Sequence, residues 1–268
     1  TEHHTFGRQI APQSIGLGSY GTDTHEIRRI VKDGVVAREG KTALGRGGFG
    51  PYQIGYGAIV PKEAECQNLL VTFALSASHT AFSSIRMEPV FMVLSQSAAT
   101  AACLAIDDGT AVQQVDYEQL KSRLIADQQV LQWPPAKAAP GAKASRSQPR
   151  KCAGPAPGKP APQYRVTVHS AEPVQLAKPA LPAAVDGKSF DVVVVGGTCG
   201  GVACAVRAAR EGCSVLLVQH NAHLGGMMAN GLMQWDALYG GPRAPLFTEL
   251  LGNIENYYLA AFGRDSRD

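Results

Sequence analysis

The glycine cluster GGTCGG at residues 196–201 is the feature that most constrains the fold of this chain. The apolar run from Val192 to Val195 precedes it, and because this run is β-branched and too short for a helix, it predicts a fully buried parallel strand. Small residues follow the cluster as far as Gly212, which predicts a helix that packs closely on a sheet. A second apolar run, Ser214 to Val218, predicts the next parallel strand. Together these elements make one βαβ unit of the length that a dinucleotide site needs.

The turn itself predicts a pyrophosphate site, since the free N–H groups and the positive dipole end of a helix N-terminus stabilise an anion. Gly196, Gly197 and Gly201 match the dinucleotide-binding fingerprint. Thr198 stands where the middle glycine is usual, and its hydroxyl is expected to donate to phosphate. Gln219 ends the second strand where an acidic residue normally accepts from the ribose hydroxyls, so its amide is expected to take that role less strongly. The alternative interpretation is a tight turn that binds no ligand.

The segment after the second strand points to a family. Residues 216–241, LLVQHNAHLGGMMANGLMQWDALYGG, resemble the amino-terminal segment of FAD-dependent oxidoreductases of the glutathione-reductase-like superfamily. The resemblance is to the bacterial branch whose members are often labelled xanthan lyase. In that superfamily the glycine pair after the strand lies against FAD. The resemblance therefore implies that FAD, and not NAD, is bound here, with contacts from Gly225, Gly226 and Met227.

The first 132 residues predict a β-rich segment followed by helices. A hairpin is expected about Asp33 and Gly34, because an Asp-Gly pair between β-branched runs is typical of a tight turn. The other expected elements are a β-rich layer over 15–50, an extended piece over 51–62, a buried strand over 68–73, a polar loop over 76–89, a core helix from Glu88 to Ile106 and an amphipathic helix from Asp116 to Leu131.

This first part resembles the carboxy-terminal part of the same flavoprotein family, which reads roughly YxIPYRxLVPK, NLLV and SATHxAxGSIRMEPxxM. The matching stretches are 52–62, 68–71 and 76–102. The resemblance implies that one short run lines the isoalloxazine and ribityl region, namely Ser84, Ile85, Arg86, Met87 and Glu88. It also implies that His79, as proton donor or acceptor, and Arg86, as partner of an anion or a flavin carbonyl, face the substrate. Gly57 stands where the family has arginine, so a contact to substrate or phosphate is expected to be lost.

The domain organisation is unusual because the carboxy-terminal family part comes first. We expect that part over residues 1–132, a disordered linker rich in Pro, Ala and Lys over 133–187, and the amino-terminal Rossmann part over 188–268. Eleven of the 17 prolines lie in the stretch from Pro134 to Pro182, so the composition of the linker does not allow it to form a hydrophobic core. The family segment between the two parts is absent. Either this is the junction of a tandem flavoprotein cut at both ends, or the two halves are permuted and meet through the linker.

Composition excludes several classes of function. The formal net charge is +3, and much of the basic excess falls in the linker, so no nucleic-acid partner is expected. Apolar runs are strand-length and no signal peptide opens the chain, so we expect a soluble protein without a membrane partner. The six cysteines form no CxxC pair and no cluster with histidine, so no metal is expected. Cys199 is singled out among them because it lies in the glycine turn, where a backbone role is favoured over redox chemistry. Compartment and oligomeric state stay open.

The sequence thus predicts an α/β protein: a Rossmann-type FAD-binding domain with a parallel sheet and helices, a β-rich segment and the linker. Its expected function is that of an oxidoreductase that moves a hydride between a small-molecule substrate and flavin. The alternatives are a catalytically silent flavin-binding fragment, an NAD-binding Rossmann module and a polysaccharide lyase.

Overall fold

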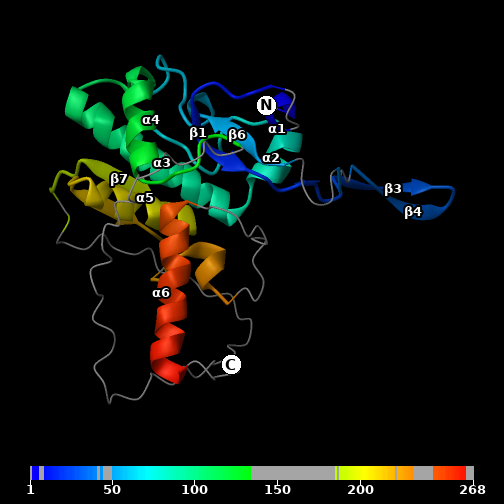
Figure 1. Cartoon of the computed structure of the whole chain (residues 1–268). Helices are drawn as coiled ribbons and strands as arrows, with labels where there is room; N and C mark the ends of the chain where they lie inside the picture. The colour runs from blue at the N-terminus through cyan, green and yellow to red at the C-terminus, as the bar shows by residue number, and fades with distance from the viewer. Residues whose placement is uncertain are drawn as a thin grey trace. The chain divides into compact units, whose positions relative to one another are not determined.

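The computed structural model describes residues 2–5, 9–40, 43–44, 50–133, 185, 187–220, 222–231 and 244–263. The chain divides into two compact units (Figure 1). The first joins Thr1–Ala142 with Phe190–Phe247, and the second joins Lys143–Ser189 with Thr248–Asp268. The expected linker lies almost wholly outside the described residues.

The predicted βαβ unit is present in the first compact unit. Strand β7 (Val192–Val195) pairs in parallel with β8 (Val215–Val218), and helix α5 (Cys199–Arg210) connects them. The prediction of full burial is wrong, because Val194 is 8% exposed whereas Val195 is 80% exposed. Among the described residues β7 and β8 form a two-stranded sheet that α5 contacts, so only alternate side chains of β7 are covered.

Helix α5 ends in a Schellman motif, as the glycine at its end predicts. Gly212 has a φ of 98°, its N–H donates to Ala209 O at 3.1 Å, and the N–H of Cys213 donates to Ala208 O at 3.2 Å. These bonds fix the direction in which the chain leaves α5 and enters β8.

Over its described residues, 9–40, 43–44 and 50–55, the β-rich segment forms three separate antiparallel pairs in place of the single layer expected from the sequence. The pairs are β1 (Ser14–Gly18) with β6 (Tyr52–Gly55), β2 (Thr22–Asp23) with β5 (Ala43–Leu44), and β3 (Arg28–Lys32) with β4 (Val35–Glu39). The hairpin prediction is confirmed. Asp33 and Gly34 have φ values of 52° and 75°, and positive φ at both central residues is the geometry of a type I′ turn.

Two expectations for the connecting segments are wrong. The extended piece beginning at residue 51 ends with β6, because a 3₁₀ turn, η1 (Tyr56–Ala58), follows at once. The stretch 68–73 is irregular: it forms no ladder along a neighbouring strand, although Val71 N–H donates to Ile59 O at 2.8 Å and Thr72 Oγ1 lies 2.8 Å from Ser95 Oγ. Its aromatic end, Phe73, is exposed. An apolar run without a paired neighbour does not form a strand.

Besides α5, the structure describes five helices, of which α1 and α2 were not predicted and α3 and α4 differ from their predicted spans at their ends. They are α1 (Glu2–Thr5), α2 (His79–Ile85), α3 (Glu88–Asp108), α4 (Tyr117–Ala126) and α6 (Pro245–Phe262), with 3₁₀ turns η2 (Val112–Gln114) and η3 (Gly226–Ala229). The α2 segment was expected to be a loop, but the hydroxyl of Ser78 accepts from Ala81 N–H and caps a helix. Helix α4 stops five residues before its expected end, where Gln128 turns the chain with a φ of 65°.

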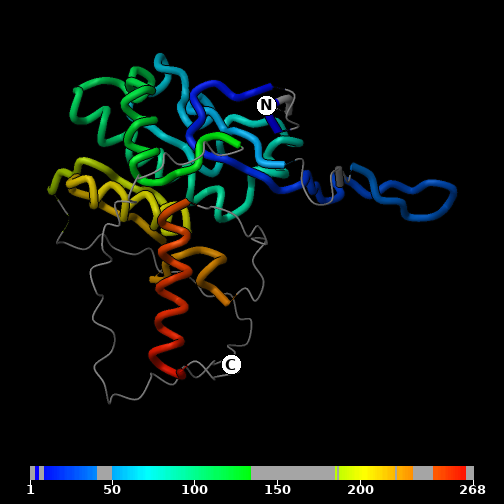
Figure 2. Tube along the Cα trace, viewed as in Figure 1, coloured from blue at the N-terminus to red at the C-terminus, as the bar shows by residue number. Residues whose placement is uncertain are grey.

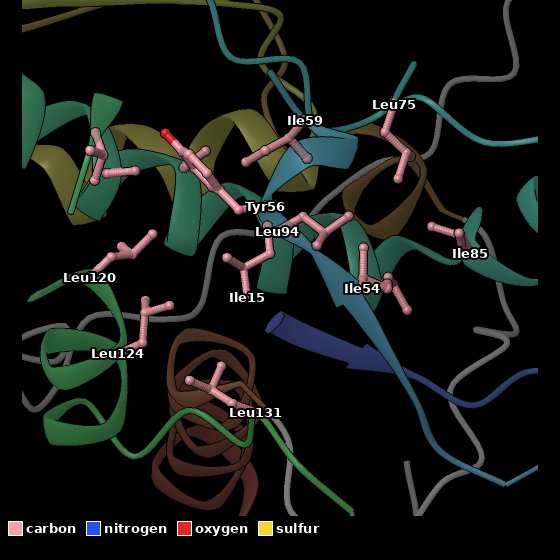
Figure 3. Packing of buried hydrophobic residues seen from close by; sticks show 14 of the residues in the cluster. Ile15, Ile54, Tyr56, Ile59, Leu75, Ile85, Leu94, Leu120, Leu124 and Leu131 are labelled. Atoms are coloured by element: carbon pink, nitrogen blue, oxygen red, sulfur yellow. The ribbon is translucent and has the colours of Figure 1, made fainter. Parts of the chain in front are cut away.

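Helix α3 is the centre of the hydrophobic core. Figure 3 shows side chains from β1, β6, α3, α4 and the loops meeting around it. The fully or nearly fully buried members include Ile15, Ile54, Tyr56, Ile59, Leu75, Ile85, Leu94, Leu120, Leu124 and Leu131. The core also holds polar anchors: Ser97 Oγ donates to Ile15 O at 2.6 Å, and Tyr56 OH donates to Val112 O at 2.7 Å. Burial raises the pKa of Tyr56, so this phenol stays protonated.

Helix α3 also corrects the expectation that apolar runs are only strand-length. By length and composition alone, Glu88–Asp108 would suffice to cross a membrane. However, 72% of its most apolar window is buried inside the protein, which is the pattern of a core helix.

Helices α3 and α5 join the two parts of the sequence within the first unit (Figure 2). Their contact is lined by small side chains, since Ala99 of α3 and Ala208 of α5 are both fully buried. Beside this contact Arg207 Nε donates to Thr100 Oγ1 at 3.1 Å. The guanidinium of Arg207 also pairs with Asp127 after α4 and with Glu211 after α5.

Helix α6 is divided between the two compact units. Its first turn belongs to the first unit, where Phe247 is buried and the N–H of Leu246 donates to Gln96 Oε1 at 3.4 Å. From Thr248 onward the helix belongs to the second unit.

Candidate functional site

The glycine turn between β7 and α5 restricts which residues its positions accept. Gly196 has a φ of 104°, a conformation that residues with a Cβ rarely adopt. A Cβ on Gly201 would lie 1.8 Å from Gly196 O, and a Cβ on Gly197 would lie 2.5 Å from Leu224 Cδ2. The backbone therefore requires glycine at Gly196 for its conformation and at Gly201 for space, whereas at Gly197 the close contact is with the end of the Leu224 side chain.

Thr198 caps the helix that follows. Its Oγ1 accepts from the N–H of Gly201 at 3.2 Å, and its backbone oxygen accepts from Val202 N–H at 2.9 Å. The hydroxyl proton of Thr198 is not used in this cap, so it is compatible with donation to an anion. The N-terminus of α5 supplies the positive end of the helix dipole at the same place.

The other predicted residues of this half lie beside the turn. Gln219 Oε1 accepts from the N–H of Gly197 at 3.0 Å, and the N–H of Gly225 donates to Gly197 O at 2.7 Å. Gly225 and Gly226 have φ values of 99° and 59°, and Gly225 forms an isolated parallel bridge with Thr198. The glycine pair thus brings a left-handed turn and the start of η3 beside the glycine turn of α5.

Two neighbouring residues support this arrangement. Leu224 packs against Gly197, and the backbone oxygen of His223 lies 3.4 Å from Gln219 Nε2. The Gln219 amide is therefore held by hydrogen bonds at both of its ends. Met227, by contrast, has an exposed side chain.

The second predicted group lies at the junction of α2 and α3, and several of its side chains point into the core. Ser84 is 0% exposed and its Oγ donates to Tyr20 O, while Tyr52 OH lies 2.5 Å from the same hydroxyl. Burial raises the pKa of Tyr52, although the hydrogen bond with Ser84 opposes the shift. Ile85 and Met87 belong to the hydrophobic core.

The predicted catalytic pair lies at the two ends of α2. His79 is the exposed first residue, and Arg86 follows the last residue as the C-cap. Seven residues of helix separate them by about 10 Å along the axis. Arg86 Nη2 donates to Asp23 O at 3.1 Å and lies 3.6 Å from Asp23 Oδ2, a partner that the sequence did not suggest because the two residues are distant in the chain.

The structure brings the glycine turn and the start of α3 together. Cys199 Sγ donates to Glu88 O at 3.7 Å. A Cβ on Gly200 would lie 2.8 Å from Ser95 Oγ and 3.2 Å from Phe91 O, so α5 and α3 approach closely at their N-terminal turns. Burial raises the pKa of Cys199 to about 11, so its thiol is neutral near pH 7 and serves packing.

A shallow hollow on the surface lies elsewhere, over residues 63–68 and 109–111. None of the predicted site residues lines it.

Comparison with known protein families agrees with this geometry. The FAD dependent oxidoreductase family matches residues 1–124 and 191–256, more than half of the chain. The chain therefore belongs to the family of FAD-dependent oxidoreductases, its cofactor is FAD, and it is a flavoprotein oxidoreductase. No curated protein and no solved structure matches this chain. The family extends over both halves of the sequence and over the helix pair that joins them.

Proposed function

We propose that FAD binds with its pyrophosphate over the glycine turn and its isoalloxazine toward the start of α3, and that the enzyme moves a hydride between a small-molecule substrate and the flavin. The observation that carries this proposal is the close approach of the two helix N-termini, through Cys199 Sγ to Glu88 O at 3.7 Å. When bound, FAD supplies the atom that accepts or returns the hydride. The protein binds, orients and shields the reacting groups.

Each residue near the turn has a proposed role. The α5 N-terminus and the hydroxyl of Thr198 bind phosphate oxygens. Gln219 turns one end of its amide toward the adenosine ribose, which requires it to exchange its contact with His223 or Gly197 for a hydroxyl. Gly225, Gly226 and Met227 provide the backbone surface on which the cofactor lies.

At the junction of α2 and α3 the proposed contacts are mainly through the backbone. Ser84, Ile85 and Met87 have buried side chains, so their peptide groups would meet the flavin. Arg86 is half-buried and its guanidinium is held by Asp23, which suits a fixed positive charge beside an anionic substrate or a flavin carbonyl. His79 is exposed and is proposed to exchange a proton with the substrate.

The finer family assignment is also a proposal. The motifs favour the glutathione-reductase-like superfamily and its branch labelled xanthan lyase, and domain boundaries near 132 and 188. The single compact unit formed by Thr1–Ala142 and Phe190–Phe247 supports the interpretation that the two halves fold together around one cofactor.

A catalytically silent flavoprotein is the second candidate. It is favoured by Gly57, where a Cβ would meet no atom within 4 Å, so the place of the family's arginine side chain is open. This candidate predicts bound FAD that no substrate reduces.

The first test is the visible spectrum of the purified chain, with the cofactor released by heat and identified by mass. FAD near one per chain supports the proposed site, and a chain that neither holds nor takes up FAD contradicts it. Bleaching of the flavin by a panel of small alcohols, amines and hydroxy acids then separates the enzyme from the silent flavoprotein.

The proposed role of Arg86 has its own test. Arg86→Ala is expected to lower kcat/KM by at least tenfold while FAD content stays within about twofold, because the residue acts on the substrate side. Lys62→Ala, which removes an exposed cation from the surface pair with Glu65, is the matched control. Equal loss of FAD and turnover in the Arg86 variant would assign the residue to cofactor binding.

A further inference from the structure

Two cysteines from opposite halves of the sequence meet between α3 and the end of α5. Cys103 Sγ and Cys213 Sγ are 3.0 Å apart, although the residues are separated by 110 positions. Both are free thiols in this structure. Neither takes part in the proposed cofactor site, so chemistry at this pair is independent of the proposed oxidoreductase activity.

The backbone holds both thiols in place. Cys103 lies inside α3, one turn after Ala99, and it packs in the small-residue contact with Ala208. Cys213 is fixed by the Schellman motif, in which its N–H donates to Ala208 O at 3.2 Å. The two sulfur atoms need to approach by only about 1 Å to reach the bonding distance of ~2.05 Å.

The two thiols differ in access to solvent. Cys103 is 2% exposed, and burial, with the nearby Cys213, Glu211 and Asp107, raises its pKa, so it stays protonated near pH 7. Cys213 is only partly buried, so it is the one that a small reagent reaches first. Cys213 is therefore expected to react first and Cys103 second.

We propose that Cys103 and Cys213 are a modification site, a reversible disulfide formed by exchange with a low-molecular-weight disulfide of the glutathione type. The Cys213 thiolate attacks one sulfur of the reagent and expels one glutathione thiolate, which leaves a mixed disulfide. Cys103 then loses its proton to solvent and attacks the Cys213 sulfur, which expels the second glutathione. The protein gives up two electrons and two protons, and the reagent takes them as two thiols.

The bond changes the stability of the first unit. It closes a loop of about 110 residues that contains the whole proline-rich stretch, and it fastens α3 to the exit of α5. Closing a long loop restricts the unfolded chain more than the folded one, so the oxidised protein unfolds at a higher temperature. The disulfide therefore secures the two family-matched segments to each other.

The experiment uses the full chain, reduced and then incubated in glutathione buffers of increasing oxidised fraction. Acid quenching, alkylation with N-ethylmaleimide and tryptic digestion then report each thiol. The expected tryptic peptides separate the cysteines, with Cys103 on 87–121, Cys213 on 211–243, and Cys199 together with Cys204 on 189–207. Non-reducing electrophoresis and thermal unfolding are measured on the same samples.

We expect a linked pair of peptides 87–121 and 211–243, faster migration without reductant, and a rise of several degrees in Tm that dithiothreitol reverses. Cys103→Ala and Cys213→Ala should each abolish the link and the rise in Tm. Cys204→Ala, in the same cluster on α5, is the matched control and should keep both. In concentrated guanidinium chloride, where the chain is unfolded, the link between Cys103 and Cys213 should be replaced by a mixture of disulfides between different cysteines.

Three results would overturn the proposal: glutathione adducts on Cys213 without a crosslink, a dominant link between 189–207 and 211–243, or a 103–213 link that leaves Tm unchanged. Should Cys103→Ala fail to fold, the peptide map of the unmodified chain still decides between these outcomes.

Discussion

Gly201 is the residue with the least freedom in the candidate site. It sits in the first turn of α5, where the helix passes directly over the oxygen of Gly196 at the end of β7. The close contact means that the helix N-terminus and the strand end share one small volume, and this proximity is what would place helix N–H groups beside a phosphate. Glycine is required here for space and not for backbone conformation.

We predict that Gly201→Ala costs about 2–3 kcal/mol in the free energy of unfolding and lowers FAD content at least tenfold, since its Cβ would lie 1.8 Å from Gly196 O. Urea unfolding and flavin content measured on the same preparation test this. Gly57→Ala is the control, because a Cβ there meets no atom within 4 Å. Normal FAD content in the Gly201 variant would show that the turn is not where the cofactor binds.

Thr198 shows how the middle position of the turn works without glycine. Thr198→Ala removes the acceptor for Gly201 N–H and is expected to cost about 1 kcal/mol of stability, whereas Thr198→Gly should cost only a few tenths. If the hydroxyl also binds phosphate, both variants lower the affinity for FAD by a similar factor. Thermal unfolding of the apo protein and titration with FAD separate the two effects, and an Ala variant as stable as the original would exclude the cap.

At the scale of elements, helix ends decide where the chain turns. Helix α4 ends with a Schellman motif: Gln128 N–H donates to Ile125 O at 2.8 Å, and Gln129 N–H donates to Leu124 O at 2.9 Å. The turn delivers the side chain of Gln129 to the core, where Nε2 donates to Ile15 O at 2.5 Å. A non-glycine residue at this position is under strain because its φ is positive.

Gln128→Gly is therefore predicted to raise the free energy of unfolding by about 0.5–1 kcal/mol, since relief of strain exceeds the added freedom of the unfolded chain. Chemical denaturation measures this. Gln119→Gly, within the same helix, should lower stability by about 1 kcal/mol. A destabilised Gln128 variant would mean that its side chain makes contacts that outweigh the strain.

The sequence predicted those elements whose ends carry local signals. Pro89 in the first turn and Gly109 after the last residue bracket α3, and the helix lies close to its predicted span. No such signal marks Gln128, because its conformation is imposed by the burial of Gln129 against β1. The α2 helix was missed since its segment is polar and only the cap at Ser78 announces it.

The candidate site likewise contains residues that are close in the sequence, whose proximity could be predicted, and pairs that are distant in the sequence, whose proximity could not. The glycines, Thr198 and Gln219 are close in sequence, so their proximity could be predicted, and the structure places them around one turn. The partners of Arg86 and of Cys103 come from residues 63 and 110 positions away. Pairs at such separations depend on the packing of whole helices, which one sequence does not reveal.

At the scale of the whole molecule, the first unit depends on the contact between α3 and α5, and Arg207 is its main electrostatic link. Its side chain is 14% exposed and lies between Asp127, Glu211 and Thr100, which come from three different parts of the chain. Asp127 Oδ2 pairs with the guanidinium by charge without a well-aligned hydrogen bond. Arg123 adds a second cation to Glu211 at 3.2 Å. Helices from both halves of the sequence therefore share one charged cluster.

Removal of Arg207 should weaken that link more than removal of any surface cation. Arg207→Met keeps the length of the side chain but removes the cation paired with the partly buried Asp127 and leaves Glu211 with Arg123 alone, so we predict a loss of about 2–3 kcal/mol in the free energy of unfolding. Arg28→Met, in an exposed pair with Glu39, should cost less than about 1 kcal/mol. Urea unfolding followed by far-UV circular dichroism compares the stabilities of the two variants. High salt should narrow the difference between their stabilities little, because the Arg207 cluster is shielded from solvent.

If the variants are equally stable, the halves are held together by α3 and α5 packing alone. A separate early transition in the Arg207 variant would instead show that the βαβ half unfolds first once its charged link to α4 is lost.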